Sequence, residues 1–267
     1  AEGVEFQTGV DVGKDISAQY LRKMFDCICL TMGARQPRDI TAPGREKGNI
    51  VFAMDYLTAQ NKLCAAEALG DIPRVNARDK VVVVLGGGDT GSDCVGTARR
   101  QRAKKIYQLE ILPKPPESRP QDTPWPMWPR MMRTSSSHEE GCERRWSFGG
   151  DNGAVKELHA CEVEWTNDKG AWKLRELPGT EFTLKVDLVF LALGFVHVAH
   201  QGLVQDLGLQ LDAKGNVIAD GYQSSEPWVF AAGDTISGAS LVVRAINSGR
   251  EAAAAIDRWL RQGSQTR

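Results

Sequence analysis

Lys80-Val81-Val82-Val83-Val84-Leu85 leads directly into Gly86-Gly87-Gly88-Asp89-Thr90-Gly91, and a helical pattern follows to about Arg102. A short run of β-branched residues that is apolar on both faces is typical of a central strand in a parallel sheet. The next apolar run, from Ile106 to Leu112, predicts a second strand. This order of strand, helix and strand predicts an α/β fold with parallel strands.

The turn between the first strand and the helix has the spacing Gly-x-Gly-x-x-Gly. In that setting the first glycine permits a tight turn, the second lets the backbone approach a pyrophosphate, and the third lets the helix pack closely. The amino terminus of the helix adds free N–H groups and a partial positive charge. We therefore predict a dinucleotide-binding turn, against the alternative of a purely structural one, made by Gly86, Gly87, Gly88, Asp89, Thr90 and Gly91.

Glu110 follows Gly91 by 19 residues and is placed at the end of the second strand. A carboxylate there commonly accepts hydrogen bonds from the adenine ribose and would repel a 2′-phosphate, which favours NADH. Several cations nearby in the sequence favour NADPH instead, or simply complement the dipole of the helix end. They are Arg99, Arg100, Arg102, Lys104 and Lys105. The pattern leaves the choice between NADH and NADPH open.

The composition is that of a globular protein of one or two domains. The chain has 267 residues, and 33 Lys and Arg side chains nearly balance 34 Asp and Glu, which argues against an extended nucleic-acid interface. No apolar stretch approaches the length of a membrane span, and no secretory signal is visible at residues 1–6. We expect a cytoplasmic protein with neither membrane nor nucleic acid as a partner. Its six cysteines lack a C-x-x-C pair, and Cys27 and Cys29 are predicted to be buried in a strand, not bound to metal.

Three further apolar strands end in glycine, at Gly33, Gly194 and Gly233. Glycines at the ends of strands along one sheet edge would let the backbone come close to a flat cofactor. Gly233 is followed by Asp234, whose carboxylate would lie beside the start of the helix predicted from Leu241 to Arg261. We therefore predict that these glycines and Asp234 form part of a second ligand site.

The segment from Pro113 to Pro129 contains seven of the 12 prolines together with Trp125 and Trp128. It cannot form a regular helix or a central strand. Either it is a surface connection packed by its own tryptophans or it is a substrate or partner loop. A strand is expected at Val4 to Thr8 and another from Thr183 to Leu193, and a helical segment near His138 to Arg144.

Four segments together resemble the small (beta) subunit of glutamate synthase, a flavoprotein in which an NAD(P)H domain is inserted into an FAD domain. They are Gly86-Gly-Gly-Asp-Thr-Gly-Ser-Asp-Cys-Val-Gly-Thr97, Leu109-Glu-Ile-Leu-Pro-Lys-Pro-Pro116, Pro124-Trp-Pro-Met-Trp-Pro129 and Ser136-Ser-His-Glu-Glu140. The resemblance runs over essentially the whole chain. It implies a Rossmann-like NAD(P)-binding domain inserted into a partial FAD-binding domain.

The resemblance also implies an activity. The small subunit oxidises NAD(P)H at FAD and passes electrons through iron–sulfur clusters to the large (alpha) subunit, where 2-oxoglutarate and glutamine yield glutamate. It implies that Asp234 holds a ribityl hydroxyl of FAD and that the backbone of Ser240, Leu241 and Val242 faces the pyrimidine end of the flavin. Because the cofactors carry the chemistry, we name no catalytic acid or base and no metal ligand.

The family's cysteine-rich iron–sulfur region and its first FAD-binding loop have no counterpart in this sequence. We therefore expect a fragment with an incomplete FAD site, and 4Fe-4S clusters only in the longer parent subunit. The expected domains are residues 1–75 and 186–267 for FAD and residues 76–185 for NAD(P)H. Apolar surface left uncovered in such a fragment would favour a homodimer.

Two other functions remain open at this stage. One is another NAD(P)H-flavin reductase, although the lack of a redox C-x-x-C disfavours a disulfide reductase. The other is a non-catalytic nucleotide-binding or electron-transfer module.

Overall fold

The computed structural model describes residues 3–112, 115–125, 127, 131, 142–149, 153–168 and 171–264. The chain forms two compact units. Unit 1 comprises Ala1–Arg38 and Phe195–Arg267, and unit 2 comprises Asp39–Gly194. Unit 2 is thus inserted, as a continuous segment, between the two parts of unit 1.

Unit 2 is built on an eight-stranded sheet in which β2, β9, β3, β4 and β5 run parallel, and the remaining pairs are antiparallel. The strand order is β2-β9-β3-β4-β5-β6-β7, and β8 pairs with β6. The strands are β2 (Ile50–Phe52), β3 (Val81–Leu85), β4 (Lys105–Glu110), β5 (Cys142–Gly149), β6 (Glu157–Asp168), β7 (Ala171–Glu176), β8 (Phe182–Lys185) and β9 (Leu188–Leu191).

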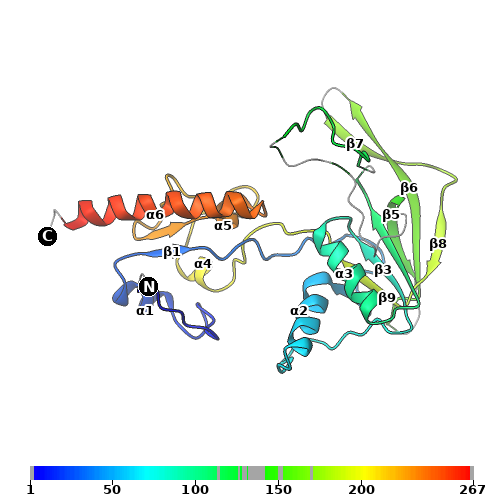
Figure 1. Ribbon diagram of the computed structural model, residues 1–267, viewed down its shortest axis with the longest axis horizontal. Coiled ribbons are helices and arrows are strands. Elements are labelled where there is room, and N and C mark those ends of the chain that lie inside the picture. Colours follow the sequence, from blue (N-terminus) through cyan, green and yellow to red (C-terminus); the bar gives the residue numbers. More distant parts are fainter. Residues whose placement is uncertain are drawn as a thin grey trace. The chain divides into compact units, whose positions relative to one another are not determined.

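Alternate residues of β3 and β9 face two different apolar cores. Val83, Leu85 and Val189 point to one core, and Val82, Val84 and Phe190 point to the other. The second core lies under α2 (Ala53–Cys64) and α3 (Asp89–Arg100), which lie side by side against the parallel strands (Figure 1). The predicted central strand is confirmed, because the side chains of residues 82–85 are all 0% exposed.

The segment from Thr183 to Leu193 forms two strands, so the prediction of one continuous strand was wrong. The chain turns at Asp187, whose N–H donates to the Val81 carbonyl and whose Oδ2 accepts from the Val81 N–H, both at 2.9 Å. This pair of hydrogen bonds takes the chain from β8, beside β6, to β9, beside β3. The helix expected near His138 to Arg144 was also wrong where the structure describes it, since residues 142–144 belong to β5, and the rest lies outside the described residues.

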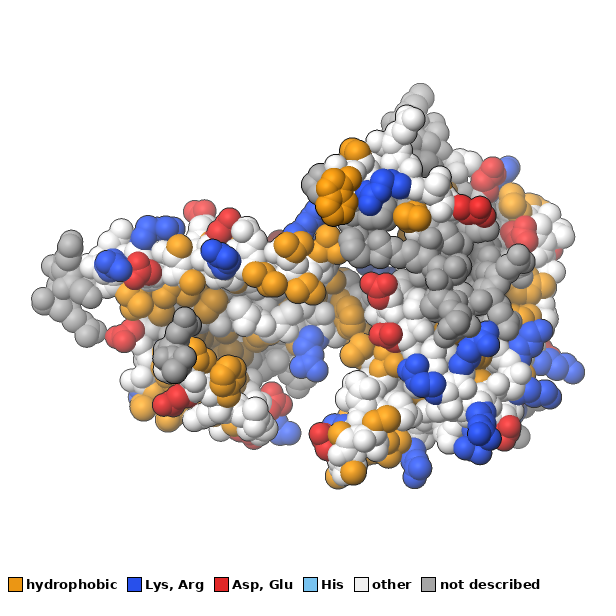
Figure 2. Space-filling model, in the orientation of Figure 1, with side chains coloured by type: hydrophobic (Ala, Val, Ile, Leu, Met, Phe, Trp, Pro, Cys, Tyr) orange, Lys and Arg blue, Asp and Glu red, His pale blue; other side chains and the backbone are white. Residues whose placement is uncertain are grey.

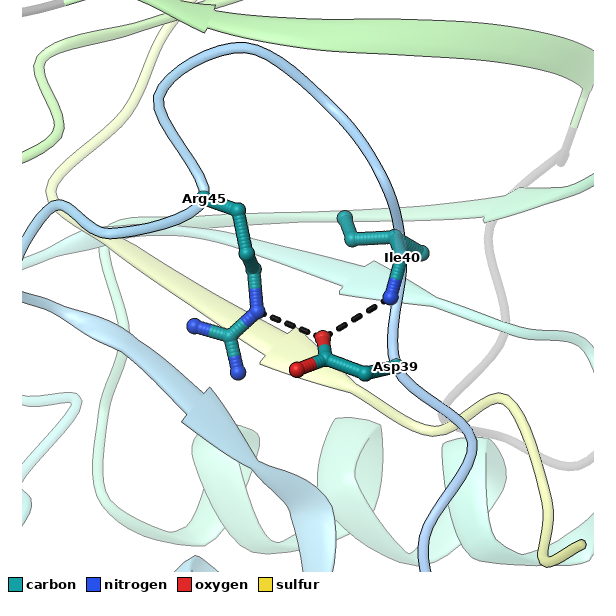
Figure 3. Close-up of polar contacts among 3 residues, drawn as sticks. All are labelled: Asp39, Ile40 and Arg45. Atoms are coloured by element: carbon teal, nitrogen blue, oxygen red, sulfur yellow. Dashed lines mark hydrogen bonds and ion pairs between the residues drawn. The ribbon is translucent and has the colours of Figure 1, made fainter.

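The loop that begins unit 2 is held by an ion pair. The Arg45 Nε–H and the Ile40 N–H both donate to Oδ1 of Asp39, at 2.6 and 2.8 Å (Figure 3). The same guanidinium lies over the ring of Phe52 in β2, 5.0 Å from its centre. Burial raises the pKa of Asp39, but the hydrogen bonds from Arg45 and Ile40 outweigh it and hold that pKa below its ordinary value.

Unit 1 contains a two-stranded parallel sheet of β1 and β10. Its elements are α1 (Ala18–Met24), β1 (Ile28–Leu30), α4 (Leu203–Asp206), β10 (Val229–Ala231), α5 (Asp234–Ser237) and α6 (Val242–Ser264). Leu30, Val229 and Ala231 pack with Val198 and Val204 in one apolar core. None of the helices in the described part of the chain combines the length and the apolar character that crossing a bilayer demands.

Two expectations for unit 1 were wrong. Residues 4–8 form no strand, and the side chains of Val4 and Phe6 are 67% and 85% exposed. Cys29 is exposed and Cys27 is partly buried, because successive side chains alternate between the two faces of the sheet, and Ile28 and Leu30 take the face that packs into the apolar core of unit 1. Burial is still the largest cause that raises the pKa of both thiols.

The compact units divide the chain after Arg38 and after Gly194, whereas the sequence predicted divisions after residues 75 and 185. The difference arises from pairing across long sequence separations. β2 and β9 bind each other and β9 binds β3, so residues on both sides of the predicted insertion complete the same sheet.

Candidate functional site

The glycine turn of unit 2 joins β3 to α3, as predicted. Gly86 has a φ of +121°, and its N–H donates to the Leu109 carbonyl of β4 at 2.8 Å. A Cβ at Gly86 would lie 2.2 Å from the carbonyl oxygen of Ala192, just beyond β9. The turn is therefore closed by the strands on both sides of β3, and only glycine fits at its first position.

Gly91 occupies the first turn of α3, directly against the bend. A Cβ at Gly91 would lie 2.2 Å from the Gly86 carbonyl oxygen. That oxygen also accepts a hydrogen bond from the Gln108 Nε2–H of β4 at 2.9 Å. Because no side chain stands between them, the helix begins immediately at the end of the strand.

Gly88 precedes α3 as its N-cap residue, and among the described residues no heavy atom would lie within 4 Å of a Cβ there. Gly87, Gly88 and Asp89 are exposed, and no side chain in the described part of the chain caps the helix. The first N–H groups of a helix have no partner within it, so those of Asp89 and Thr90 require one from outside. The open space at Gly88 therefore lies where helix N–H groups and the helix dipole favour an anion.

Glu110 ends β4 beside this turn. Its Oε2 accepts a hydrogen bond from the Gly87 N–H at 2.5 Å, and its Oε1 accepts from the N–H groups of Ile111 and Leu112 at 2.7 and 3.0 Å. The structure thus brings the predicted acid into direct contact with the predicted glycine turn. Three backbone N–H groups fix the position of the carboxylate.

The cations that favoured NADPH do not adjoin Glu110, so that part of the sequence argument was wrong. Lys105 starts β4, which ends at Glu110, and six residues of strand separate its ends by roughly 16 Å. The N–H of Lys104 donates to the carbonyl of Lys80, just before β3 begins. Arg99 and Arg100 end α3, and the Arg102 carbonyl accepts from the Asp79 N–H. All five cations therefore lie at the amino-terminal edge of these strands.

In unit 1, Gly33 and Gly233 follow the paired strands β1 and β10, and both have a positive φ, of +72° and +64°. The Gly33 N–H donates to Oγ1 of Thr235 at 3.1 Å, and the Gly233 N–H donates to Oγ of Ser248 at 2.8 Å. Thr235 is 0% exposed. The two glycines therefore share one sheet edge, and hydroxyl groups from α5 and α6 hold them in place.

Asp234 begins α5 and is partly buried, and its Oδ1 accepts a hydrogen bond from the Ser240 hydroxyl at 2.9 Å. The chain then enters α6, where the Leu241 carbonyl accepts from the N–H groups of Arg244 and Ala245. The side chains of Leu241 and Val242 are 40% and 75% exposed, and apolar side chains gather over the start of α6 (Figure 2). Asp234, Ser240, Leu241 and Val242 thus lie next to one another.

Gly194 does not share this edge, so the expectation that it joins Gly33 and Gly233 was wrong. It follows β9, which belongs to the eight-stranded sheet of unit 2. There it comes two residues after Ala192, whose carbonyl closes the Gly86 bend. Three apolar strands that end in glycine look alike in a sequence, although they belong to two different sheets.

Sequence reasoning missed the residues that hold these glycines. Ser248 follows Gly233 by 15 residues, and Thr235 contacts Gly33 across 202 residues. No local pattern links such pairs. Gln108 had a detectable signal, because it is a polar residue in an apolar strand, two residues before Glu110.

The proline-rich segment is only partly described. Nη1 of Arg119 donates to the carbonyls of Thr123 and Met127, both at 2.8 Å, and so braces the loop. Trp125 is 83% exposed, so packing within the loop does not bury this tryptophan. Trp128, His138, Glu139 and Glu140 lie outside the described residues. Within the described ranges, no three His, Cys, Asp or Glu side chains are grouped so as to hold a metal ion.

Comparison with known proteins supports the fold and the resemblance. Residues 152–249 match the family model for pyridine nucleotide-disulphide oxidoreductases. The chain also superposes on FprA of Mycobacterium tuberculosis in complex with NADPH, with a TM-score of 0.70 and 13% identity, over 96% of this chain and 68% of that one. At that identity the likeness concerns the fold alone, and the predicted α/β class is confirmed.

Two bacterial relatives are far more similar in sequence. The glutamate synthase [NADPH] small chain of Mycobacterium tuberculosis is 45% identical over 97% of this chain and 54% of the relative. The protein of the same name from Bacillus subtilis is 39% identical over 97% of this chain and 55% of the relative. The chain therefore spans about half the length of the curated relatives that it matches. Over the length that it shares with them, it is similar in sequence to the glutamate synthase small chains.

Proposed function

We propose that this chain is the NAD(P)H-oxidising part of a glutamate synthase small (beta) subunit. The observation that carries the proposal is the open bend from Gly86 to Gly91, at the uncapped start of α3, in a homologue of these small chains. Such a bend offers backbone N–H groups and space to a diphosphate and excludes side chains.

The residues of this bend fit an NAD(P)H dinucleotide. Space at Gly88 would admit the pyrophosphate, and the helix N–H groups of Asp89 and Thr90 would donate to it. Glu110 retains unused acceptor capacity for a hydroxyl of the adenine ribose, because a carboxylate has about four lone-pair sites and three N–H groups occupy it. In this proposal the turn binds the coenzyme, and Gly194 borders the same sheet edge.

Unit 1 fits the flavin end of an FAD. A Cβ at Gly33 would meet no atom of the described ranges within 4 Å, so backbone there is open to a flat group. Asp234 would accept a hydrogen bond from a ribityl hydroxyl, and the backbone of Ser240, Leu241 and Val242 would face the pyrimidine ring. When bound, FAD would supply the acceptor for hydride. The chain's own residues would hold and orient the two cofactors and exclude water, which requires no catalytic acid or base.

We further propose the partners that this role requires. Electrons would leave through 4Fe-4S clusters of the parent subunit to the large (alpha) subunit, where glutamate would form from 2-oxoglutarate and glutamine. The reaction would take place in the cytoplasm. The exposed apolar residues of unit 1 are compatible with a homodimer of the 267-residue chain.

Calorimetric titration of the chain with NADH and with NADPH tests the proposal. We expect saturable binding of one dinucleotide per chain, and no binding after Gly88→Val, which fills the open space at the bend. Gly263→Val is a matched control, because a Cβ at Gly263 also meets no described heavy atom within 4 Å, its φ is not positive, and the residue is exposed near the end of α6. Absence of binding by the unaltered chain, or equal binding by the Gly88→Val chain, would refute the site.

A further inference from the structure

We infer that Glu110 makes the proposed dinucleotide site selective for NADH over NADPH. The inference rests on the proposed function, because it concerns the ribose end of the same site. It names a specificity-determining residue and a preferred substrate, which neither the family match nor the names of the relatives settle. The two bacterial relatives carry [NADPH] in their names, whereas the glutamate synthase of Schizosaccharomyces pombe, which is 40% identical over 96% of this chain and 13% of that protein, carries [NADH].

The first step is that three backbone hydrogen bonds hold the carboxylate in place. Gly87 holds one of its oxygens through an N–H hydrogen bond, and Ile111 and Leu112 hold the other. These three donors are backbone groups at the turn and at the end of β4, so they keep their positions. Withdrawal of the Glu110 side chain to admit a phosphate would leave all three N–H groups without this acceptor, at a cost comparable to several hydrogen bonds.

The second step is that the fixed group is an acceptor only. An ionised carboxylate can accept a hydrogen bond from a ribose 2′-hydroxyl, but a 2′-phosphate offers it only negative oxygens. The nearest turn N–H, that of Gly87, is already bound to Glu110 and is not free to donate to a phosphate. Both the charge and the hydrogen-bonding pattern therefore favour the hydroxyl.

The third step concerns compensation by cations. The five cations that precede Glu110 in the sequence lie at the opposite edge of the sheet, roughly 16 Å away along β4. Lys105 lies over the ring of Tyr107, and an Nη of Arg100 donates to Oγ1 of Thr97 within α3. These two side chains are held by partners near their own positions, and the separation along β4 keeps the five cations from contacting a 2′-phosphate beside Glu110.

The experiment measures the dissociation constants of NADH and NADPH for the 267-residue chain by calorimetry, for the unaltered protein, Glu110→Gln and Glu181→Gln. Glu110→Gln removes the charge and keeps one acceptor oxygen for the turn. Glu181→Gln removes the same charge from an exposed position before β8. We expect NADH to bind at least about tenfold more tightly than NADPH, and the ratio to fall by about tenfold in Glu110→Gln only.

Each outcome decides the inference. Equal or tighter binding of NADPH by the unaltered chain would overturn it, as would an unchanged ratio in Glu110→Gln. Binding of neither dinucleotide would refute the proposed function itself, which separates the two failures. If Glu110→Gln does not fold, Gly87→Ala replaces it. A Cβ at Gly87 would lie 2.9 Å from Oε2 of Glu110 and would displace the carboxylate, so the same fall in the ratio is expected.

Discussion

The carbonyl oxygen of Ala192 lies 2.2 Å from the position that a Cβ on Gly86 would take. The end of β9 therefore packs directly on the backbone of the bend after β3. The bend is also tied to β4 through the Leu109 carbonyl, so three neighbouring strands fix its path. A turn fixed in this way can present N–H groups to a ligand without a cost for ordering them.

Two glycine substitutions separate the structural role of the bend from its proposed binding role. Gly86→Ala introduces a clash with backbone at a φ of +121°, so we expect a loss of about 3 kcal/mol or more in the free energy of unfolding. Gly88→Ala meets open space at a φ of −80°, so its loss should stay below about 1 kcal/mol. Urea unfolding measures both changes.

For NADH binding, in contrast to stability, Gly88 is the sensitive position. Gly88→Ala should weaken NADH binding at least about tenfold, because the added methyl group occupies the space proposed for the pyrophosphate. A stable Gly88→Ala protein that binds NADH normally would contradict the assignment of that space.

A buried tyrosine joins the helix layer of unit 2 to its sheet. The Tyr56 ring is 0% exposed and stacks on Phe190 with centres 3.9 Å apart, and its hydroxyl donates to Oε1 of Gln101 at 3.0 Å. Burial is the largest cause that raises the pKa of this hydroxyl, which therefore stays protonated at neutral pH. Tyr56→Phe should cost about 0.5–1.5 kcal/mol, because Oε1 keeps its second donor, the Ala77 N–H.

Tyr20→Phe is the matched control for Tyr56→Phe, because Tyr20 is 49% exposed. The free energy of unfolding of the Tyr20→Phe variant should match that of the unaltered chain. Equal stability of both variants would show that the Tyr56 hydroxyl contributes nothing.

The Asp39 and Arg45 pair predicts a pH dependence of stability. The pKa of Asp39 is lower in the folded chain than its ordinary value of 3.8, so the unfolded chain binds this proton more tightly. The resulting stabilisation is complete above pH 3.8 and is lost as the pH falls through the folded pKa. Arg45→Gln should therefore destabilise the chain at pH 7 and have less effect in acid. Because the Asp39 side chain is 48% exposed, solvent screening should keep the loss below about 1 kcal/mol.

Arg74→Gln removes the same charge from an exposed residue of unit 2 and serves as the control. Urea unfolding at several values of pH between 3 and 7 compares the two variants. If the destabilisation caused by Arg45→Gln, measured against Arg74→Gln, grew as the pH fell, the proposed role of the Asp39 and Arg45 pair would be contradicted.

The hydroxyl of Thr235 should stabilise the sheet edge of unit 1 at which Gly33 lies, because it accepts a hydrogen bond from the Gly33 N–H. Thr235→Val removes the acceptor of the Gly33 N–H and should cost about 1–3 kcal/mol. Thr235→Ser keeps an oxygen and should retain slow exchange of the Gly33 amide, which hydrogen exchange measures. Fast exchange in Thr235→Ser and slow exchange in Thr235→Val would contradict the role of the hydroxyl.

The parts of the fold that sequence could predict depend on local chemistry. Val82 and Val84 mark β3 because a β-branched run buried on both faces suits a central parallel strand. The glycine turn could be predicted because its requirements are all contained within six residues, from Gly86 to Gly91. Glu110 was found because the length of a helix and a strand fixes its distance from that turn.

The parts that sequence could not predict depend on distant partners. β9 lies between β2 and β3 in the sheet, and no local sequence pattern near Leu188 predicts that position. The cations near Arg100 could not be assigned to one edge of the sheet, because a strand of six residues separates groups that look adjacent in the sequence. Gly194 was grouped with Gly33 for the same reason, since only strand pairing distinguishes the two sheets.

The most direct test of the central claim is a backbone amide spectrum of the chain during titration with NADH. If the bend binds the diphosphate, the largest shifts should occur at the N–H groups of Gly88, Asp89 and Thr90. Unchanged signals from those three amides at saturating NADH would contradict the account.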